Sequence, residues 1–220
     1  MAVQIDAYGR CISPGPDGLC GSRIKIVQSE AGVTAILTDG FGGDAKAAIL
    51  SSLAVKMMLA MLARGEPIDE IADMIVDSQP IGKNKREDYS TFTILQISNS
   101  GMIFVSQMET PDAILLRHGK PVDLKPSRKI RQGRVIRNAL LRTRDVDTVI
   151  AVGNGLLQAG AKRNLQGGWK LKQISAYMAN ASTRRVTAEK LVRLLLSAGS
   201  SLSRGESKDN LSALVFRVSR

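Results

Sequence analysis

Three oxygen-bearing side chains share one kind of sequence context, although they lie far apart in the chain. Asp39, Asn154 and Asp209 each stand at an end of an apolar run, beside glycine or a short polar turn. Hard cations such as Mg²⁺ and Mn²⁺ prefer carboxylate, amide and backbone carbonyl oxygens, and strand ends hold such groups rigidly. Gly40 follows Asp39 and lets a carbonyl approach an ion without an obstructing Cβ. Each motif alone is typical of an ordinary turn, whereas the order of all three favours a divalent-cation site.

The apolar runs predict the elements that would position the first of these residues. An alternating run over 23–28 and a β-branched run over 33–38 are separated by a glycine-containing turn, so we expect a hairpin that ends at Asp39. Ala, Leu and Met at helical spacing over 45–63 then predict a long helix.

The remaining elements decide the fold class. Strands follow one another through short turns in the middle of the chain, which favours antiparallel pairing, and helices fall in blocks between groups of strands. We therefore predict an α+β fold in one domain over residues 1–220, with 1–20 a poorly ordered or peripheral lead-in. Further strands are expected at 89–98, 102–108, 113–117, 146–152 and 211–218, and further helices at 68–77, 169–180 and 187–199.

The net charge of +11 is concentrated in one part of the chain. The segment 117–144 holds ten Lys or Arg and one acid, Asp123, so it could attract phosphate groups or an acidic protein. It has no aromatic residue on which bases could stack, and no helix-turn-helix or zinc signature accompanies it, so nucleic acid is the least favoured partner. A phosphorylated protein partner and a solvated basic face with no dedicated partner remain as alternatives.

Composition excludes two other classes of protein. The longest apolar stretch, 47–63, is interrupted by Lys56 and is shorter than the roughly 20 residues of a membrane span. The N-terminal residues lack the pattern of an export signal, so we expect a cytoplasmic protein without a membrane segment.

Cys11, Cys20 and His118 are too few for the usual zinc site. A disulfide between the two cysteines is compatible with their spacing, but reduced thiols are favoured in the cytosol.

Five segments contain these residues in a definite order. They are Thr38-Asp39-Gly40-Phe41-Gly42-Gly43 with the helix that follows, Glu87-Asp88-Tyr89-Ser90-Thr91-Phe92-Thr93, 108–124, 148–155, and Asp209-Asn210-Leu211-Ser212. In composition and order these segments resemble the metal-dependent serine/threonine protein phosphatases of type 2C. Within that superfamily they resemble the bacterial branch named for the stage II sporulation protein E. The resemblance covers most of residues 20–220.

The resemblance implies a fold, a metal centre and an activity. The fold would be a sandwich of two antiparallel sheets flanked by helices. Two Mn²⁺ or Mg²⁺ ions would be bridged by the catalytic Asp39, with the Gly40 carbonyl on one ion and Asn154 and Asp209 on the other. A water between the ions would attack the phosphorus of phosphoserine or phosphothreonine in line, without a covalent enzyme intermediate. The substrate would be a phosphorylated bacterial regulatory protein.

Two positions depart from the pattern of the branch. Asn154 stands where the family carries Asp, and Gly21-Ser22 stands where the branch usually has Gly-Asp. Two fewer carboxylates should lower the affinity for at least one ion, unless Asp17 substitutes for one of them. The sequence therefore leaves two functions open: a weak, Mn²⁺-demanding phosphatase, and a pseudophosphatase that acts as a protein-binding signalling module.

Overall fold

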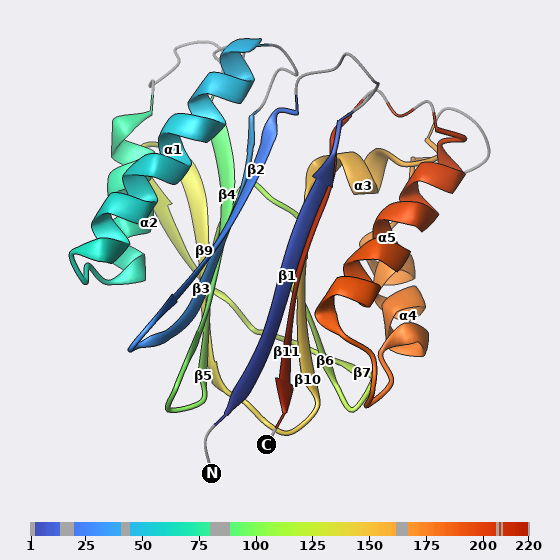
Figure 1. The fold of residues 1–220 in the computed structure, drawn as a ribbon. Helices are drawn as coiled ribbons and strands as arrows, with labels where there is room; N and C mark the ends of the chain where they lie inside the picture. The colour runs from blue at the N-terminus through green and yellow to red at the C-terminus, as the bar shows by residue number, and fades with distance from the viewer. Residues whose placement is uncertain are drawn as a thin grey trace.

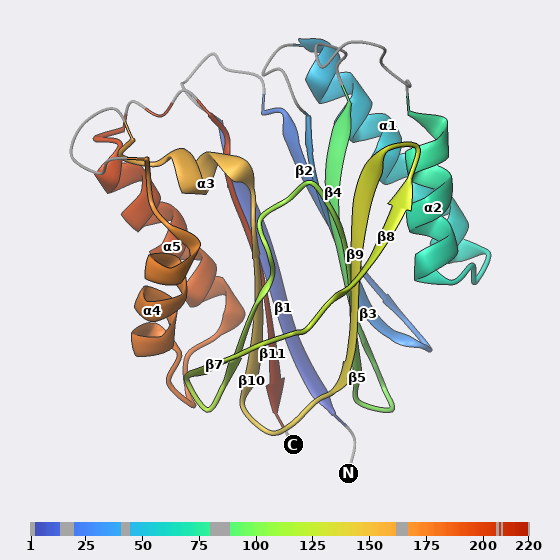
Figure 2. The ribbon, with the colours of Figure 1, turned by 180° about the vertical axis from the view of Figure 1, so that it is seen from behind.

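Two β-sheets pack face to face, with helices on the outer side of each sheet (Figures 1 and 2). The computed structural model describes residues 3–13, 20–40, 45–79, 89–161, 167–205, 207 and 209–219. One sheet has the strand order β1-β11-β10-β6-β7 and the other β2-β3-β4-β5-β9-β8, with antiparallel pairing between neighbours. The predicted α+β sandwich is confirmed.

The bounds of the elements follow the apolar runs closely for most of the chain. The strands are β1 (Gln4–Ile12), β2 (Ser22–Ser29), β3 (Gly32–Gly40), β4 (Ser90–Ser98), β5 (Met102–Met108), β6 (Ile114–Arg117), β7 (Lys120–Val122), β8 (Ser127–Arg131), β9 (Arg134–Arg142), β10 (Asp147–Val152) and β11 (Leu211–Ser219). The helices are α1 (Ala45–Ala63), α2 (Ile68–Ser78), α3 (Asn154–Gln158), α4 (Leu171–Ala181) and α5 (Ala188–Leu202). Within the described residues, none of these helices combines the length and the apolar character that a bilayer crossing requires.

The central strands are buried on both faces, which explains their continuous apolar sequence. Leu37 of β3 and Phe216 of β11 contribute to the core between the two sheets. Ile36, next to Leu37, contributes instead to the layer that β3 and β4 form with α1 and α2, where Met58 is fully buried. The ends of the central strands are therefore held firmly in place on both sides.

The first strand lies where the sequence analysis expected only a peripheral lead-in. β1 pairs with β11 along its whole length, from Gln4 opposite Ser219 to Ile12 opposite Leu211. On its inward face Ile5 and Ala7 pack against the core between the sheets, followed by Gly9, where an added Cβ would lie 2.6 Å from Cγ2 of Ile24. Because Ile5 is the one large apolar residue among these three, the apolar alternation is weak and the pattern did not indicate a strand.

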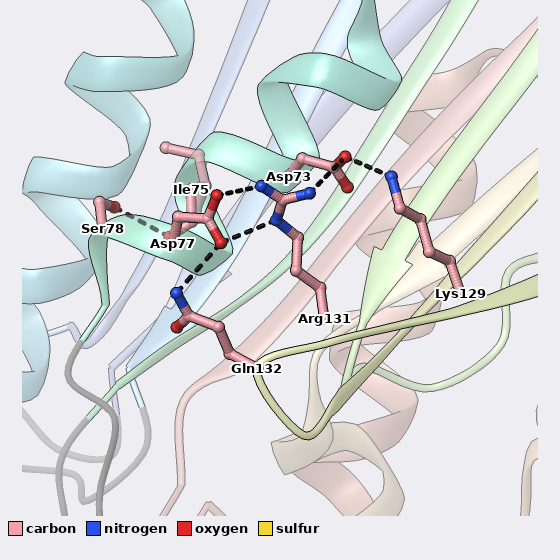
Figure 3. Close-up of polar contacts among 7 residues, drawn as sticks. All are labelled: Asp73, Ile75, Asp77, Ser78, Lys129, Arg131 and Gln132. Carbon is pink, nitrogen blue, oxygen red and sulfur yellow. Dashed lines mark hydrogen bonds and ion pairs between the residues drawn. The ribbon is translucent and has the colours of Figure 1, made fainter.

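The basic segment contains a second group of strands that the sequence did not predict. β8 and β9 form a hairpin beside α2. Figure 3 shows the polar contacts between this hairpin and α2. Arg131 donates from Nη1 to Oδ2 of Asp73 at 3.1 Å and from Nε to Oδ1 of Asp77 at 2.7 Å. Gln132 donates from Nε2 to Oδ1 of Asp77 at 3.1 Å. Lys129 also pairs with Asp73. The acids of α2 thus fix the hairpin and neutralise part of its charge.

Two further cations of this segment are also paired. Arg117 lies 2.9 Å from Asp147, and Arg137 lies 2.6 Å from Asp112. The exposed cations for which the described residues show no acidic partner are Lys120, Lys125, Arg128, Arg142 and Arg144. The basic surface is therefore smaller than the sequence alone suggested.

Candidate metal centre

The strand ends named by the sequence analysis meet at one end of the sandwich. Asp39 and Gly40 end β3 in the six-stranded sheet. Asn154 begins α3 directly after β10, and Asp209 precedes β11, so both are positioned by the five-stranded sheet. This is the upper end in Figure 1, opposite to the chain termini. Residues that are far apart in sequence are therefore brought to one place.

Asp39 is the central residue of this cluster. The backbone N–H of Asn154 donates to its carboxylate, and Asp209 is near enough to act on it by charge repulsion. The hydroxyl of Thr91 donates to the backbone carbonyl of Asp39 at 3.1 Å, which fixes the strand end. The two sheets thus contribute jointly to the surroundings of one carboxylate.

Ser22 of β2 lies directly opposite Asp39 in the strand register. Its side chain is fully buried, and its Oγ donates to Oδ1 of Asp39 at 3.0 Å. This is the position where the resemblance described under Sequence analysis leads us to expect Asp. The departure noted in the sequence therefore falls beside the central carboxylate, where it supplies a hydroxyl in place of a second negative charge.

The charge balance of the cluster favours a cation. Burial raises the pKa of the Asp39 carboxyl to about 6. The hydrogen bond from Ser22 lowers this pKa, repulsion from Asp209 raises it further, and the hydrogen bond from the Asn154 N–H lowers it. Among the described residues, no Lys or Arg forms an ion pair with either carboxylate. A divalent cation would supply the missing positive charge.

The raised pKa predicts how the stability of the metal-free protein depends on pH. The folded state binds more protons than the unfolded state between the ordinary value of 3.8 and about 6. The free energy of unfolding should therefore fall by about 3 kcal/mol as pH rises through this range. Urea unfolding in EDTA between pH 4 and 8 measures the fall. Asp39→Asn should remove this fall in the free energy of unfolding. The same pH slope in both proteins would contradict the raised pKa of Asp39.

Two glycines make the close approach of the loops feasible. A Cβ on Gly153 would lie 2.1 Å from Oγ of Ser212 and 3.3 Å from Oδ2 of Asp39. A Cβ on Gly155 would lie 3.1 Å from Cβ of Asp209. Any larger residue at Gly153 would push the loop after β10 away from both the serine and the aspartate.

Asn210 and Ser212 belong to the predicted motif before and in β11, but no role was predicted for either side chain. Ser212 Oγ is buried and has no hydrogen-bond partner in the described structure, and it adjoins Gly153. Asn210 Oδ1 accepts a hydrogen bond from the Gly21 N–H at 3.1 Å, which links the loop before β11 to the start of β2. The unsatisfied oxygen of Ser212 is a further polar group that a cation or its hydration shell could engage.

The predicted ligands differ in how they are held. The Asn154 side chain donates from Nδ2 to the Glu109 carbonyl at 3.5 Å, so only its backbone is in contact with Asp39. Asp209 is exposed, and Ser207 hydrogen-bonds its backbone at 2.7 and 3.3 Å. Residues of the predicted motifs that lie outside the described residues are Asp17, Phe41, Gly42, Gly43, Glu87 and Asp88.

The donor set of the described residues fits a divalent cation. Asp39 and Asp209 provide two carboxylates, with backbone and hydroxyl oxygens beside them. Within the described part of the chain, no group of three or more His, Cys, Asp or Glu is arranged to hold a metal ion.

Solved structures share this fold over almost the whole chain. The phosphatase domain of SpoIIE from Bacillus subtilis matches with a TM-score of 0.74 and 14% identity, over 99% of this chain and 93% of that one. The catalytic domain of the serine/threonine protein phosphatase PstP, solved with two manganese ions, matches with a TM-score of 0.69 and 15% identity, over 99% and 100%. RsbX in complex with magnesium matches with a TM-score of 0.66 and 14% identity, over 99% and 96%.

Sequence comparison identifies the family. A comparison with curated protein sequences gave no significant match. The family model of stage II sporulation protein E (SpoIIE) matches residues 29–219, which is most of the chain. The match begins at the end of β2 and includes all four predicted ligand positions. The chain therefore belongs to the stage II sporulation protein E family and has the fold of the PP2C-type phosphatases.

Proposed function

We propose that this chain hydrolyses phosphoserine or phosphothreonine on a bacterial regulatory protein and depends on Mn²⁺ or Mg²⁺ to do so. The observation that carries the proposal is the convergence of Asp39 and Asp209, from different sheets, with no basic side chain paired to either in the described structure. Membership of the family supports the class of reaction. The relatives solved with manganese and magnesium support the choice of cation.

The residues have distinct roles in this proposal. Asp39, Asp209, the Gly40 carbonyl and Asn154 would hold the cation. When bound, the metal supplies an activated water for in-line attack on phosphorus and positive charge for the phosphoryl oxygens. The hydrogen bonds from Ser22 and the Asn154 N–H fix the orientation of the Asp39 carboxylate. Because the pKa of Asp39 is about 6 without metal, the ionised form needed for binding predominates at neutral pH.

A pseudophosphatase is the second candidate, and a specific observation favours it. Ser22 is fully buried beside Asp39, and it lies where the branch usually has a carboxylate. With Asn154 in place of a second Asp, the centre carries less charge than two dications require. In this alternative the fold would bind a signalling partner and turn over little or no substrate.

Calorimetric titration of the metal-free protein with Mn²⁺, combined with a phosphoserine peptide assay, separates these functions. We expect one Mn²⁺ per chain and slow turnover that EDTA abolishes. Asp209→Asn should weaken Mn²⁺ binding, whereas the exposed Asp123→Asn, far from the cluster, should not. Binding without turnover would favour the pseudophosphatase, and no binding at all would contradict both the ligand set and the activity.

The basic segment 117–144 is our proposed docking face for the phosphorylated partner. Changing the exposed Lys125 and Arg128 to Glu should raise KM for phosphorylated casein about tenfold, because rim charges act mainly on encounter with an acidic partner. Turnover of a short phosphopeptide should not change. The charge-matched control is Lys172→Glu with Lys190→Glu on the helices over the other sheet. An equal rise of KM in the control would show that net charge alone is responsible.

A further inference from the structure

The two cysteines lie against each other at the metal-binding end of the sandwich. Their Sγ atoms are 2.9 Å apart, and both thiols are free and partly exposed. Cys11 belongs to β1 of the five-stranded sheet, and Cys20 lies two residues before the start of β2 in the six-stranded sheet. The thiol pair therefore spans the same two sheets as the candidate metal centre.

Both cysteines adjoin residues of that centre without belonging to it. Cys11 is the cross-strand neighbour of Ser212. Cys20 donates from Sγ to the Ser22 carbonyl at 3.4 Å, and the Ser22 side chain in turn donates to Asp39. A bond between the two sulfurs would thus fix the spacing of the sheets within one or two residues of the Asp39 surroundings.

We propose that Cys11 and Cys20 form a dithiol modification site, which a small disulfide such as oxidised glutathione converts into an intramolecular disulfide between the two sheets. The sulfurs need to approach by less than about 1 Å to reach the bonded distance of about 2.05 Å. Partial exposure gives the small oxidant access. The neighbouring thiol has a large advantage over a second molecule of oxidant, because it is already held in place.

The surroundings assign the order of the two steps. The hydrogen bond between the two sulfurs lowers the pKa of the Cys20 thiol to about 7 against the effect of burial, with help from the Ser22 backbone and the charge of Arg23. The partner thiol has the opposite shift, because the hydrogen bond to Cys20 and burial raise the pKa of Cys11. Cys20 is therefore the sulfur that attacks first.

The reaction balances with the oxidant named. The Cys20 thiolate attacks one sulfur of oxidised glutathione, the glutathione S–S bond breaks, and one glutathione leaves as thiolate. Cys11 then loses its proton and attacks Sγ of Cys20, which releases the second glutathione. Two electrons pass from the protein thiols to the small disulfide, and the two protein protons end on the two glutathione thiols.

The test uses the full chain in EDTA, so it does not depend on the proposed phosphatase activity. Incubation with oxidised glutathione should lower the mass by about 2 Da and leave no titratable thiol. Peptide mapping should recover one cross-linked peptide that contains Cys11 and Cys20. The Tm should rise by about 5 °C, because the bond closes a loop that is open in the unfolded chain. Dithiothreitol should reverse every change.

Single variants supply the matched controls. Cys11→Ser and Cys20→Ser each retain one thiol and should show no rise of Tm and no loss of about 2 Da under the same treatment. Peptide mapping of the unaltered protein keeps the test valid if either variant fails to fold. A glutathione adduct that persists on Cys20 beside a free Cys11, a disulfide-linked dimer, an unreacted protein or an unchanged Tm would each overturn the proposal.

Discussion

Replacing Asp39 with alanine is expected to lower Mn²⁺-dependent turnover of a phosphoserine peptide by about a thousandfold or more. Asp39 is the residue on which the Ser22 hydroxyl, the Asn154 N–H and the charge of Asp209 all act. Its loss leaves Asp209 as the one remaining carboxylate among the predicted ligands. Calorimetry should therefore show weakened Mn²⁺ binding in the same variant.

The stability of the variant provides the control for this result. Removing a carboxylate whose pKa is raised by burial should not destabilise the metal-free protein at neutral pH, and Asp39→Asn should stabilise it. A drop in activity with an unchanged or higher Tm therefore points to the metal centre and not to misfolding. Turnover that persists in Asp39→Ala would refute the assignment of Asp39.

Restoring the two missing carboxylates has the second large expected effect. Ser22→Asp together with Asn154→Asp should raise Mn²⁺ affinity about a hundredfold, because affinity for hard cations follows the number of charged ligands. Ser22 is already 3.0 Å from Oδ1 of Asp39, so a carboxylate there reaches the same space. If the native chain is a pseudophosphatase, the double variant should create turnover that the native chain lacks.

Two controls separate charge from size. Ser22→Asn introduces an amide of the same shape as Asp and should not increase Mn²⁺ affinity. The double variant without metal should unfold at a lower temperature, because its added carboxylates repel Asp39, and Mn²⁺ should restore its Tm. Equal turnover in the native and doubly restored proteins would reject the pseudophosphatase, and unchanged Mn²⁺ affinity would contradict the placement of Ser22.

Most of the fold could be predicted because its central elements are buried on both sides. The hairpin ending at Asp39, the helix over 45–63 and the strands from 89 to 108 have long apolar runs bounded by glycine or polar turns, and the structure has them at nearly the predicted residues. Burial on two faces leaves a strong signal in a single sequence, because most residues in such a strand are apolar or small.

Two of the edge strands, β1 and β8, could not be predicted, although the edge strand β2 was predicted from its alternating apolar run. β8 carries Arg128, Lys129 and Arg131, and the last two are paired with acids of α2 from a distant part of the chain. β1 presents Ile5, Ala7 and Gly9 to the core, so only one large apolar residue marks its inward face. In both cases the strand is stabilised by a partner that is not visible in the local sequence.

The sequence suggests which residues form the candidate site, and that assignment stays a prediction, whereas the geometry could not be predicted. The order of Asp39, Asn154 and Asp209 indicated a common role, whereas the contact of Asp39 with the backbone of Asn154 depends on the path of the loop after Gly153. The orphaned hydroxyl of Ser212 likewise arises from packing between loops. Distances of this kind are set by the tertiary structure. The one local sequence feature that indicates them is Gly153, which allows the close approach of the loop.

The pairing of β1 with β11 has a practical consequence for engineering. Gln4 lies opposite Ser219, at the end of the sandwich away from the candidate metal centre (Figure 1). A short flexible linker could therefore join the two ends, and new termini could be opened at an exposed turn elsewhere, such as that between β4 and β5. A circularly permuted chain of this kind would retain both sheets. In the unpermuted chain, fluorescent reporters or affinity tags attached at the ends of β1 and β11 would leave the approach to Asp209 unobstructed.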